Sequence, residues 1–190
     1  MKSYTFNKKV VLVRHGQTLW NLEKRTQGHL DSPLTEQGVL QAKETAGRLK
    51  NYKFDLVISS PLGRALQTAE IISEELNINN IQINPNLSER HLGVLQGFTK
   101  EDSLKKYPSF FDSNSRFIQN SDIPEAETLP EFLNRIKTAV KEIEQVSKDK
   151  NVLVVTHDGV LYAVMSHVKN IDFSEIQKFY KFEHCDPIEL

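Results

Sequence analysis

Residues 10–21 read VVLVRHGQTLWN. The apolar residues 10–13 run without a polar interruption into Arg14, His15 and Gly16. An uninterrupted apolar run of this kind is typical of a strand that is buried on both faces, as in a parallel sheet. A strand end normally needs only a turn, whereas this one carries a guanidinium and an imidazole, two groups that suit an anion. Gly16 would let the chain turn there, so that both side chains face one site.

The composition of the chain is that of an ordinary globular protein. It has 190 residues, 38% of them hydrophobic, and its formal net charge is −1. This balance argues against nucleic acid and anionic membranes as partners, so a local cluster would have to bind any anion. The N-terminal segment has no apolar run long enough for a signal peptide, and Cys185 is the single cysteine. We therefore expect a cytoplasmic protein with one domain, residues 1–190.

Two further apolar runs, residues 56–58 and 152–155, also lack polar alternation and are predicted to be buried strands. Helical patterns separate these runs, and strand alternating with helix predicts an α/β sandwich with a central sheet. The helices are expected to run from the cap Thr35 to about Leu49, from Ser60 and Pro61 through Leu76, over residues 128–148, and onward from Asp158 and Gly159.

Two other stretches are less clearly patterned. Residues 99–128 contain Pro108 and Pro124 among many small polar residues, which favours a flap or lid over the site. Leu19 and Trp20 stand beside the first motif, and we expect them to serve the core.

Chemically active side chains also follow the other two predicted strands. Arg64 falls in the first turn of a helix, where free N–H groups and the helix dipole already favour an anion. His157 follows the third strand, and Asp158 is expected to cap the next helix. Glu89 and Arg90 lie in a glycine-containing loop. Alone, each has an ordinary explanation: an exposed arginine, a structural histidine or a solvated loop. Because parallel strands end at one edge of a sheet, together they predict a pocket that suits phosphoryl transfer.

The sequence contains no pattern typical of a metal or nucleotide site. It has no His-x-x-x-His pair on a helix, no Asp-rich loop and no Walker-type glycine loop. We therefore expect no metal, and the arginines would meet the charge on a transferring phosphoryl group.

These motifs resemble the histidine phosphatase superfamily, in the branch that includes the cofactor-dependent phosphoglycerate mutases. The resemblance implies a three-layer α/β/α sandwich with a central, mostly parallel sheet. It covers most of the chain in order, with RHGQTLWN (14–21), PLTEQGVLQA (33–42), SSPLGRALQT (59–68), LSERHLGVLQG (87–97), PEAET (124–128) and VVTHDG (154–159).

The resemblance implies a phosphohistidine mechanism. His15 would be the nucleophile, and Arg14, Arg64 and His157 would hold the phosphoryl oxygens. Glu89 would protonate the leaving oxygen and then activate the water that hydrolyses the phosphohistidine. Further contacts to the phosphate or to the rest of the substrate are expected from Thr18, Asn21, Gln27, Gly28, Arg90 and Lys100.

The resemblance leaves open which group accepts the phosphoryl group. Lys100 and the ERH and LQG sequences are similar to mutases, whereas Leu92 stands where mutases usually have a tyrosine. Arg116 is the single arginine in 107–127, whereas mutases usually have a pair of arginines there. The chain is also shorter than typical mutases, which leaves less lid to exclude water. We therefore expect a phosphatase that hydrolyses small phosphomonoesters and needs no cofactor; 2,3-bisphosphoglycerate would be required only if the mutase alternative holds.

A third alternative is a regulatory module that binds phosphate without turnover. Asp158 supports this alternative, because a negative charge directly after His157 could repel phosphate. We expect instead that its carboxylate caps the helix and faces away from the site. The expected partner is a small phosphorylated substrate, and the protein would be a monomer or a homodimer.

Overall fold

The computed structural model describes residues 4–115, 117–119 and 121–190, so Arg116 lies outside the described residues. One mostly parallel sheet forms its centre, in the strand order β3-β2-β4-β1-β5. Only β5 runs antiparallel to its neighbour, β1, among the described strands. The strands are β1 (Val10–Arg14), β2 (Leu56–Ser59), β3 (Ile81–Ile83), β4 (Val152–Thr156) and β5 (Ile188–Glu189).

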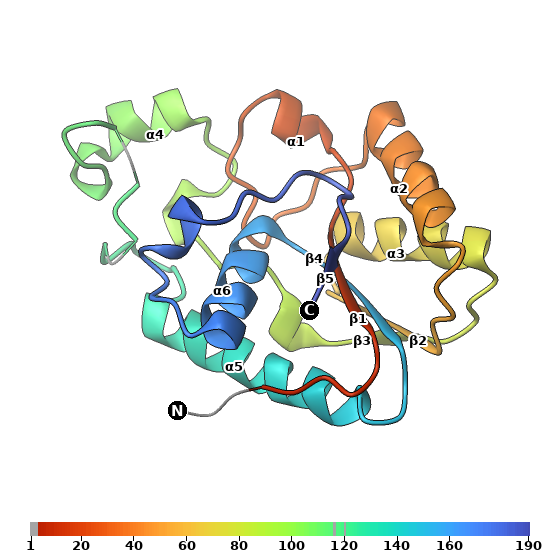
Figure 1. Cartoon of the computed structure of the whole chain (residues 1–190). Coiled ribbons are helices and arrows are strands. Elements are labelled where there is room, and N and C mark those ends of the chain that lie inside the picture. Colours follow the sequence, from red (N-terminus) through yellow and green to blue (C-terminus); the bar gives the residue numbers. More distant parts are fainter. Residues whose placement is uncertain (1–3, 116, 120) are drawn as a thin grey trace.

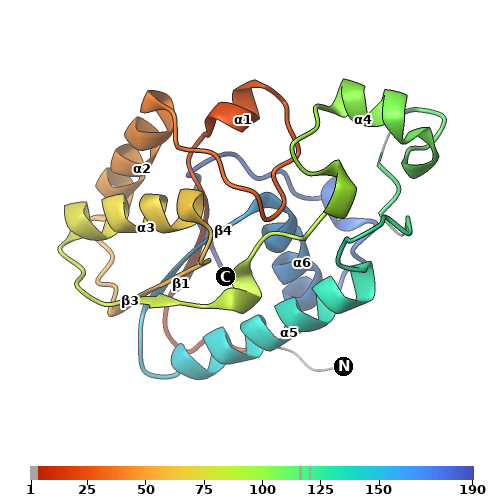
Figure 2. The same cartoon turned by 180° about the vertical axis from the view of Figure 1, so that it is seen from behind.

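Helices cover both faces of this sheet. Figures 1 and 2 show α2 and α3 together on one side and α5 and α6 on the other, which confirms the predicted three-layer sandwich. The helices are α1 (Leu19–Leu22), α2 (Glu36–Leu49), α3 (Gly63–Leu76), α4 (Lys100–Lys106), α5 (Leu129–Val146) and α6 (Asp158–Lys169).

The apolar strands divide their side chains between two cores. Leu12 and Val154 face α5 and α6, whereas Val11, Val13 and Val155 face α2 and α3. Successive residues of a strand point to opposite faces, so a strand covered on both sides has to be apolar throughout. Each of these side chains is at most 1% exposed, and burial of such a side chain contributes roughly 1.5–3 kcal/mol to folding.

The predicted helices are present, but two of the predicted caps are wrong. α3 begins at Gly63 with Leu62 at its cap position and no side-chain cap, while the hydroxyl of Ser60 accepts from the N–H of Leu62 at 3.3 Å and bonds to the ring of His157. Asp158 is the first residue of α6 and not its cap; His157 occupies the cap position, and the Asp158 carboxylate pairs with Arg14. By contrast, the hydroxyl of Thr35 caps α2 as expected.

Between β3 and α5, Leu87 packs in the core beside the sheet, whereas α4 lies away from it. α4 stands at the edge of the molecule in both views (Figures 1 and 2), and the role of residues 99–128 as a lid stays a prediction. The expectation for Leu19 is wrong, because its side chain on α1 is 45% exposed.

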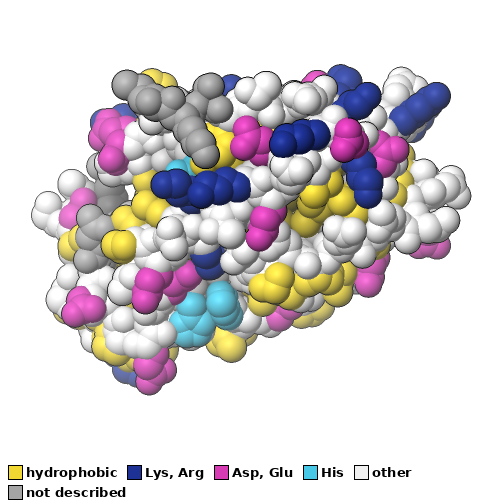
Figure 3. Space-filling view, turned by 90° about the horizontal axis from the view of Figure 1, so that it is seen from below, with side chains coloured by type: hydrophobic (Ala, Val, Ile, Leu, Met, Phe, Trp, Pro, Cys, Tyr) yellow, Lys and Arg dark blue, Asp and Glu magenta, His cyan; other side chains and the backbone are white. Residues whose placement is uncertain are grey.

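The lower face of the molecule carries no dominant charge. Figure 3 shows lysine and arginine side chains interspersed there with acidic and hydrophobic ones. Within the described residues, no helix combines the length and the apolar character needed to cross a bilayer.

Candidate active site

The register of the sheet brings three strand ends to one level. Arg14 of β1 lies opposite Thr156 of β4, and Ser59 of β2 lies opposite Val155. The residue that follows each strand therefore reaches the same edge of the sheet. Those residues are His15, Ser60 and His157, and the site is built around them.

His15 is a buried, uncharged imidazole whose Nε2 carries a lone pair. Its Nδ1 lies 2.8 Å from the carbonyl oxygen of Gly16, which can only accept, so Nδ1 carries the proton. Nε2 then accepts from Nε of Arg64 at 3.3 Å. Burial lowers the pKa of His15 well below its ordinary value, and the nearby guanidinium of Arg64 lowers it further.

Gly16 is required for a different reason from the one expected. Its φ is not in the left-handed region that would demand a glycine. A Cβ there would instead lie 2.5 Å from the carbonyl oxygen of Gly38, at the start of α2. The missing side chain lets α2 approach the turn, and the N–H of Gly16 donates to Thr68 of α3 at 3.0 Å. Both helices thereby fix the backbone on which His15 stands.

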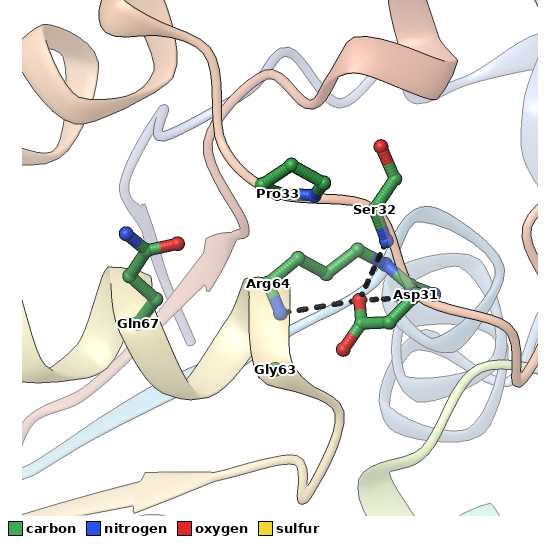
Figure 4. A pocket seen from close by; sticks show the side chains of 6 residues that line it. All are labelled: Asp31, Ser32, Pro33, Gly63, Arg64 and Gln67. Carbon is green, nitrogen blue, oxygen red and sulfur yellow. Dashed lines mark hydrogen bonds and ion pairs between the residues drawn. The ribbon is translucent and has the colours of Figure 1, made fainter.

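Arg64 is buried and held by several hydrogen bonds in the first turn of α3. It is 2% exposed, and its Nη atoms donate to the carbonyl oxygens of Gly28 and Leu30 at 2.8 and 3.0 Å. The carboxylate of Asp31 accepts from both Nη1 and the backbone N–H of Arg64, at 3.1 and 3.3 Å (Figure 4). A Cβ at Gly63 would lie 2.5 Å from that carboxylate. Arg64 and Asp31 also line a neighbouring cavity of about 290 Å³ (Figure 4).

Arg14 approaches His15 from the end of its own strand. Its Nη1 donates to the carbonyl oxygen of Phe182 at 2.9 Å and lies 3.3 Å from the carboxylate of Asp158. Its Nε is buried without a hydrogen-bond partner among the described residues. A buried guanidinium N–H with no acceptor is costly, and a bound anion would satisfy it.

His157 completes the ring of nitrogen atoms. It is fully buried, with its ring centroid 5.3 Å from that of His15. Its Nε2 lies 2.7 Å from the hydroxyl of Ser60, and its buried Nδ1 has no partner in the described part of the chain. Burial is the main reason why the pKa of His157 lies well below its ordinary value, and Arg64 lowers it further.

Two carboxyl groups line a cavity of about 180 Å³ beside these residues. The oxygens of Glu89 accept from the backbone N–H groups of Arg90 and Gly159, at 2.9 and 3.2 Å. Asp158 faces the same cavity. Burial raises the pKa of Asp158 from its ordinary 3.8 to about 6, although the charge of Arg14 opposes this rise.

The arrangement suits a tetrahedral anion bound against His15. Two guanidiniums and a second imidazole lie around the ring of His15, and Arg14 and His157 each have a buried nitrogen without a hydrogen-bond partner among the described residues. Among the described residues, no group of three or more His, Cys, Asp or Glu side chains could hold a metal ion.

The family follows from comparison with known proteins. The sequence profile of the histidine phosphatase superfamily (branch 1) matches residues 10–186. The chain belongs to this superfamily. The "uncharacterized phosphatase PhoE" of Bacillus subtilis (strain 168) is 34% identical over 163 residues, 86% of this chain and 78% of that protein. The "phosphoglycerate mutase-like protein 4" of Arabidopsis thaliana is 37% identical over 162 residues, 84% of this chain and 70% of that protein.

The fold of the superfamily is equally plain in three dimensions. The solved structure of Bacillus stearothermophilus YhfR matches with a TM-score of 0.86 at 31% identity, and the match covers 96% of this chain and 90% of that one. The predicted α/β fold and the predicted family are therefore both confirmed.

The structure brings most of the predicted histidine phosphatase residues together. Gly28 holds Arg64 through its carbonyl oxygen, and the buried Gln27 has an Oε1 atom with no partner among the described residues. Thr18 and Asn21 instead form the capping box of α1, in which the amide oxygen of Asn21 accepts from Thr18.

The other two predicted substrate contacts line cavities: Arg90 lines that of Glu89, and Lys100 lines a second one. The guanidinium of Arg90 donates to the carbonyl oxygens of Glu127 and Gln119, at 3.0 and 2.9 Å, so it holds the loop together. Lys100 lines a separate cavity of about 370 Å³, which shares Leu92 with the cavity of Glu89.

Three residues around the site escaped sequence reasoning. Asp31 clamps Arg64, and Arg135 of α5 donates to the carbonyl oxygen of Glu89 at 2.9 Å. His184 lies beside His15, with ring centroids 5.5 Å apart. An aspartate followed by proline two residues on looks like an ordinary turn, and Arg135 looks like a polar position of a helix. No local pattern marks His184.

Proposed function

We propose that the protein hydrolyses small phosphomonoesters through a phosphohistidine formed on Nε2 of His15. The observation that carries this proposal is the state of His15: a neutral ring whose Nε2 lone pair accepts a hydrogen bond from Arg64. The unpartnered nitrogens of Arg14 and His157 beside it support the binding of a phosphate. An imidazole can attack phosphorus only while one ring nitrogen is unprotonated, and the lowered pKa of His15 keeps its Nε2 in that state at neutral pH.

The first step transfers the phosphoryl group to the protein. Nε2 of His15 forms a bond to phosphorus while the bond to the ester oxygen breaks. Arg14, Arg64 and His157 donate to the three non-bridging oxygens and spread their charge. The protonated Glu89 gives its proton to the leaving oxygen, and the alcohol departs.

The second step returns His15 to its starting state. The Glu89 carboxylate takes a proton from a water molecule, whose oxygen attacks phosphorus as the bond to Nε2 breaks. The two backbone N–H groups that hold Glu89 keep the carboxyl at the edge of the cavity through both steps. Inorganic phosphate then leaves.

The experiment that tests this proposal measures phosphate release from a panel of phosphomonoesters. His15→Ala should abolish release while the melting temperature stays within a few degrees; retained activity would exclude a phosphohistidine. Glu89→Gln should lower kcat/KM for alkyl phosphates far more than for 4-nitrophenyl phosphate, because kcat/KM reports the first step, in which only a poor leaving group needs the proton. Asp158→Asn is the matched control, since its carboxyl lines the same cavity. An equal fall in kcat/KM for both esters in Glu89→Gln would argue against its role as the acid.

The cavity beside Glu89 favours an apolar leaving group over a phosphoglycerate. Its lining includes Leu92, Phe117, Phe132 and Phe173, and Arg90 is the one lysine or arginine among the described lining residues. The guanidinium of Arg90 already donates to two carbonyl oxygens, which leaves little for a substrate carboxylate. We therefore favour the phosphatase over the mutase.

The panel also decides between these alternatives. It includes 3-phosphoglycerate, assayed with and without 2,3-bisphosphoglycerate. Formation of 2-phosphoglycerate with little phosphate release would identify a mutase. Stoichiometric phosphate binding without turnover of any ester would identify a regulatory module.

A further inference from the structure

The C-terminal segment 182–185 makes three bonds to residues 14–15. The carbonyl oxygen of Phe182 accepts from Arg14, and the N–H of Cys185 donates to the carbonyl oxygen of Arg14 at 3.0 Å. Nδ1 of His184 lies 2.9 Å from the carbonyl oxygen of His15. The segment then joins the sheet as β5, beside β1 (Figure 1). The end of the chain therefore rests directly on the two residues that begin the site.

The ring of His184 is about as close to His15 as the ring of His157 is. Its ring centroid lies 5.5 Å from that of His15, and the corresponding distance for His157 is 5.3 Å. Because a carbonyl oxygen only accepts, Nδ1 of His184 carries a proton in this bond. Nε2 has no hydrogen-bond partner among the described residues, and the side chain is half-buried. This nitrogen is free to meet a ligand.

The backbone holds His184 in place by a conformation that few residues adopt. Cys185 has a φ of +56°, in the left-handed region, although it is not a glycine. It is fully buried, and its carbonyl oxygen accepts from Thr45 and, at 2.7 Å, from Arg48 of α2. Such a conformation persists where surrounding contacts enforce it, and it is frequent at functional sites.

We propose that His184 is a third imidazole of the phosphate site: Nδ1–H holds the carbonyl group of His15, and Nε2, once protonated, donates to the bound phosphate. This inference rests on the proposed function, because it assigns a further residue to the same site. Burial and the charge of Arg14 lower the pKa of His184, so the ring is neutral in the free protein. A dianion bound at His15 favours the protonated ring, which then has a donor on each nitrogen.

Two substitutions separate the roles of the two nitrogens. His184→Asn keeps an amide where Nδ1 stands and removes Nε2, whereas His184→Gln carries its amide farther out, near the place of Nε2. His167→Asn is the control, because His167 lies in the last turn of α6 and bonds to the carbonyl oxygen of Leu133. Binding of orthovanadate, an anion of the shape of phosphate, is measured by calorimetry on the full chain, and the melting temperature of each variant is recorded.

We expect His184→Asn to bind orthovanadate at least about tenfold more weakly than the wild type, because a hydrogen bond to a charged group is lost. His184→Gln should stay within about threefold of the wild type, and His167→Asn should bind unchanged. Wild-type affinity in a folded His184→Asn variant would overturn the proposal. If that variant does not fold, His184→Gln decides: a tenfold loss in a folded protein would show that only the Nδ1 bond matters.

The result is separable from the test of the proposed function. A wild type that binds orthovanadate but releases no phosphate from any ester would refute hydrolysis, and the comparison of variants would still decide the role of His184. A wild type that fails to bind orthovanadate would overturn the phosphate site and His184 with it.

Discussion

Replacing Asp158 by asparagine should stabilise the protein at neutral pH and have much less effect in mild acid. The carboxyl group of Asp158 has a pKa of about 6 in the folded chain and 3.8 as its ordinary value. Between these two pH values the folded chain keeps a proton that the unfolded chain has lost. The free energy of unfolding therefore falls as the pH rises from about 3.8 to about 6, and stays low above that. The amide of asparagine resembles the protonated carboxyl and does not titrate.

The size of the effect follows from the same two values. Their difference corresponds to at most about 3 kcal/mol of lost stability above pH 6. The side chain of Asp158 is 39% exposed, so water screens its charge, and we expect about 1 kcal/mol. For a chain of 190 residues, that is a gain of roughly 2–4 °C in melting temperature.

The assay is urea unfolding of the wild type and Asp158→Asn at pH 4.5 and pH 7.5. Asp186→Asn is the control, because Asp186 pairs with Arg48 at 2.9 Å on the surface, where both side chains are more than half exposed. We expect a gain for Asp158→Asn at pH 7.5 that largely disappears at pH 4.5, and little pH dependence for the control. A gain of equal size at both pH values, or a loss at pH 7.5, would refute the reasoning.

Three further predictions concern single residues. Asp31→Asn should lower the free energy of unfolding by about 1–2 kcal/mol, measured by urea unfolding, because the buried Arg64 loses its charged partner. Gly159→Ala should slow alkyl phosphates about tenfold more than 4-nitrophenyl phosphate, since the new Cβ would lie 2.5 Å from the carboxylate of Glu89 and displace it. Cys185 should not react with a thiol reagent in the native protein and should react once unfolded, because burial raises the pKa of its thiol to about 12.

The centre of the site could be predicted because it depends on short-range patterns. Three apolar runs predict three buried strands, and parallel strands end at one edge of a sheet. His15, Arg64 and His157 stand at or just beyond those ends, so their meeting follows once the sheet is parallel. The family motifs then added Glu89, which no strand end places.

The surroundings of these residues could not be predicted, because they depend on partners far away in the chain. Serine is a common helix-capping residue, yet the hydroxyl of Ser60 bonds to His157, 97 residues later. Asp158 likewise turns to Arg14, since β1 and β4 are neighbours in space. His184 reaches His15 across 169 residues only because the chain returns to the sheet as β5.

The two arginine–aspartate pairs of the site should respond oppositely to the same kind of substitution. Asp31 neutralises a guanidinium whose side chain is 1% exposed, so removing its charge leaves a buried cation unpaired and destabilises the fold. In the other pair the charged carboxylate of Asp158 is destabilised, because burial raises its pKa despite the charge of Arg14. Asp31 lines the cavity of about 290 Å³ beside Arg64, whereas Asp158 lines the cavity of Glu89. The carboxyl that costs stability is therefore the one that lines the cavity beside the proposed phosphate site, and function and stability are expected to oppose each other at such a place.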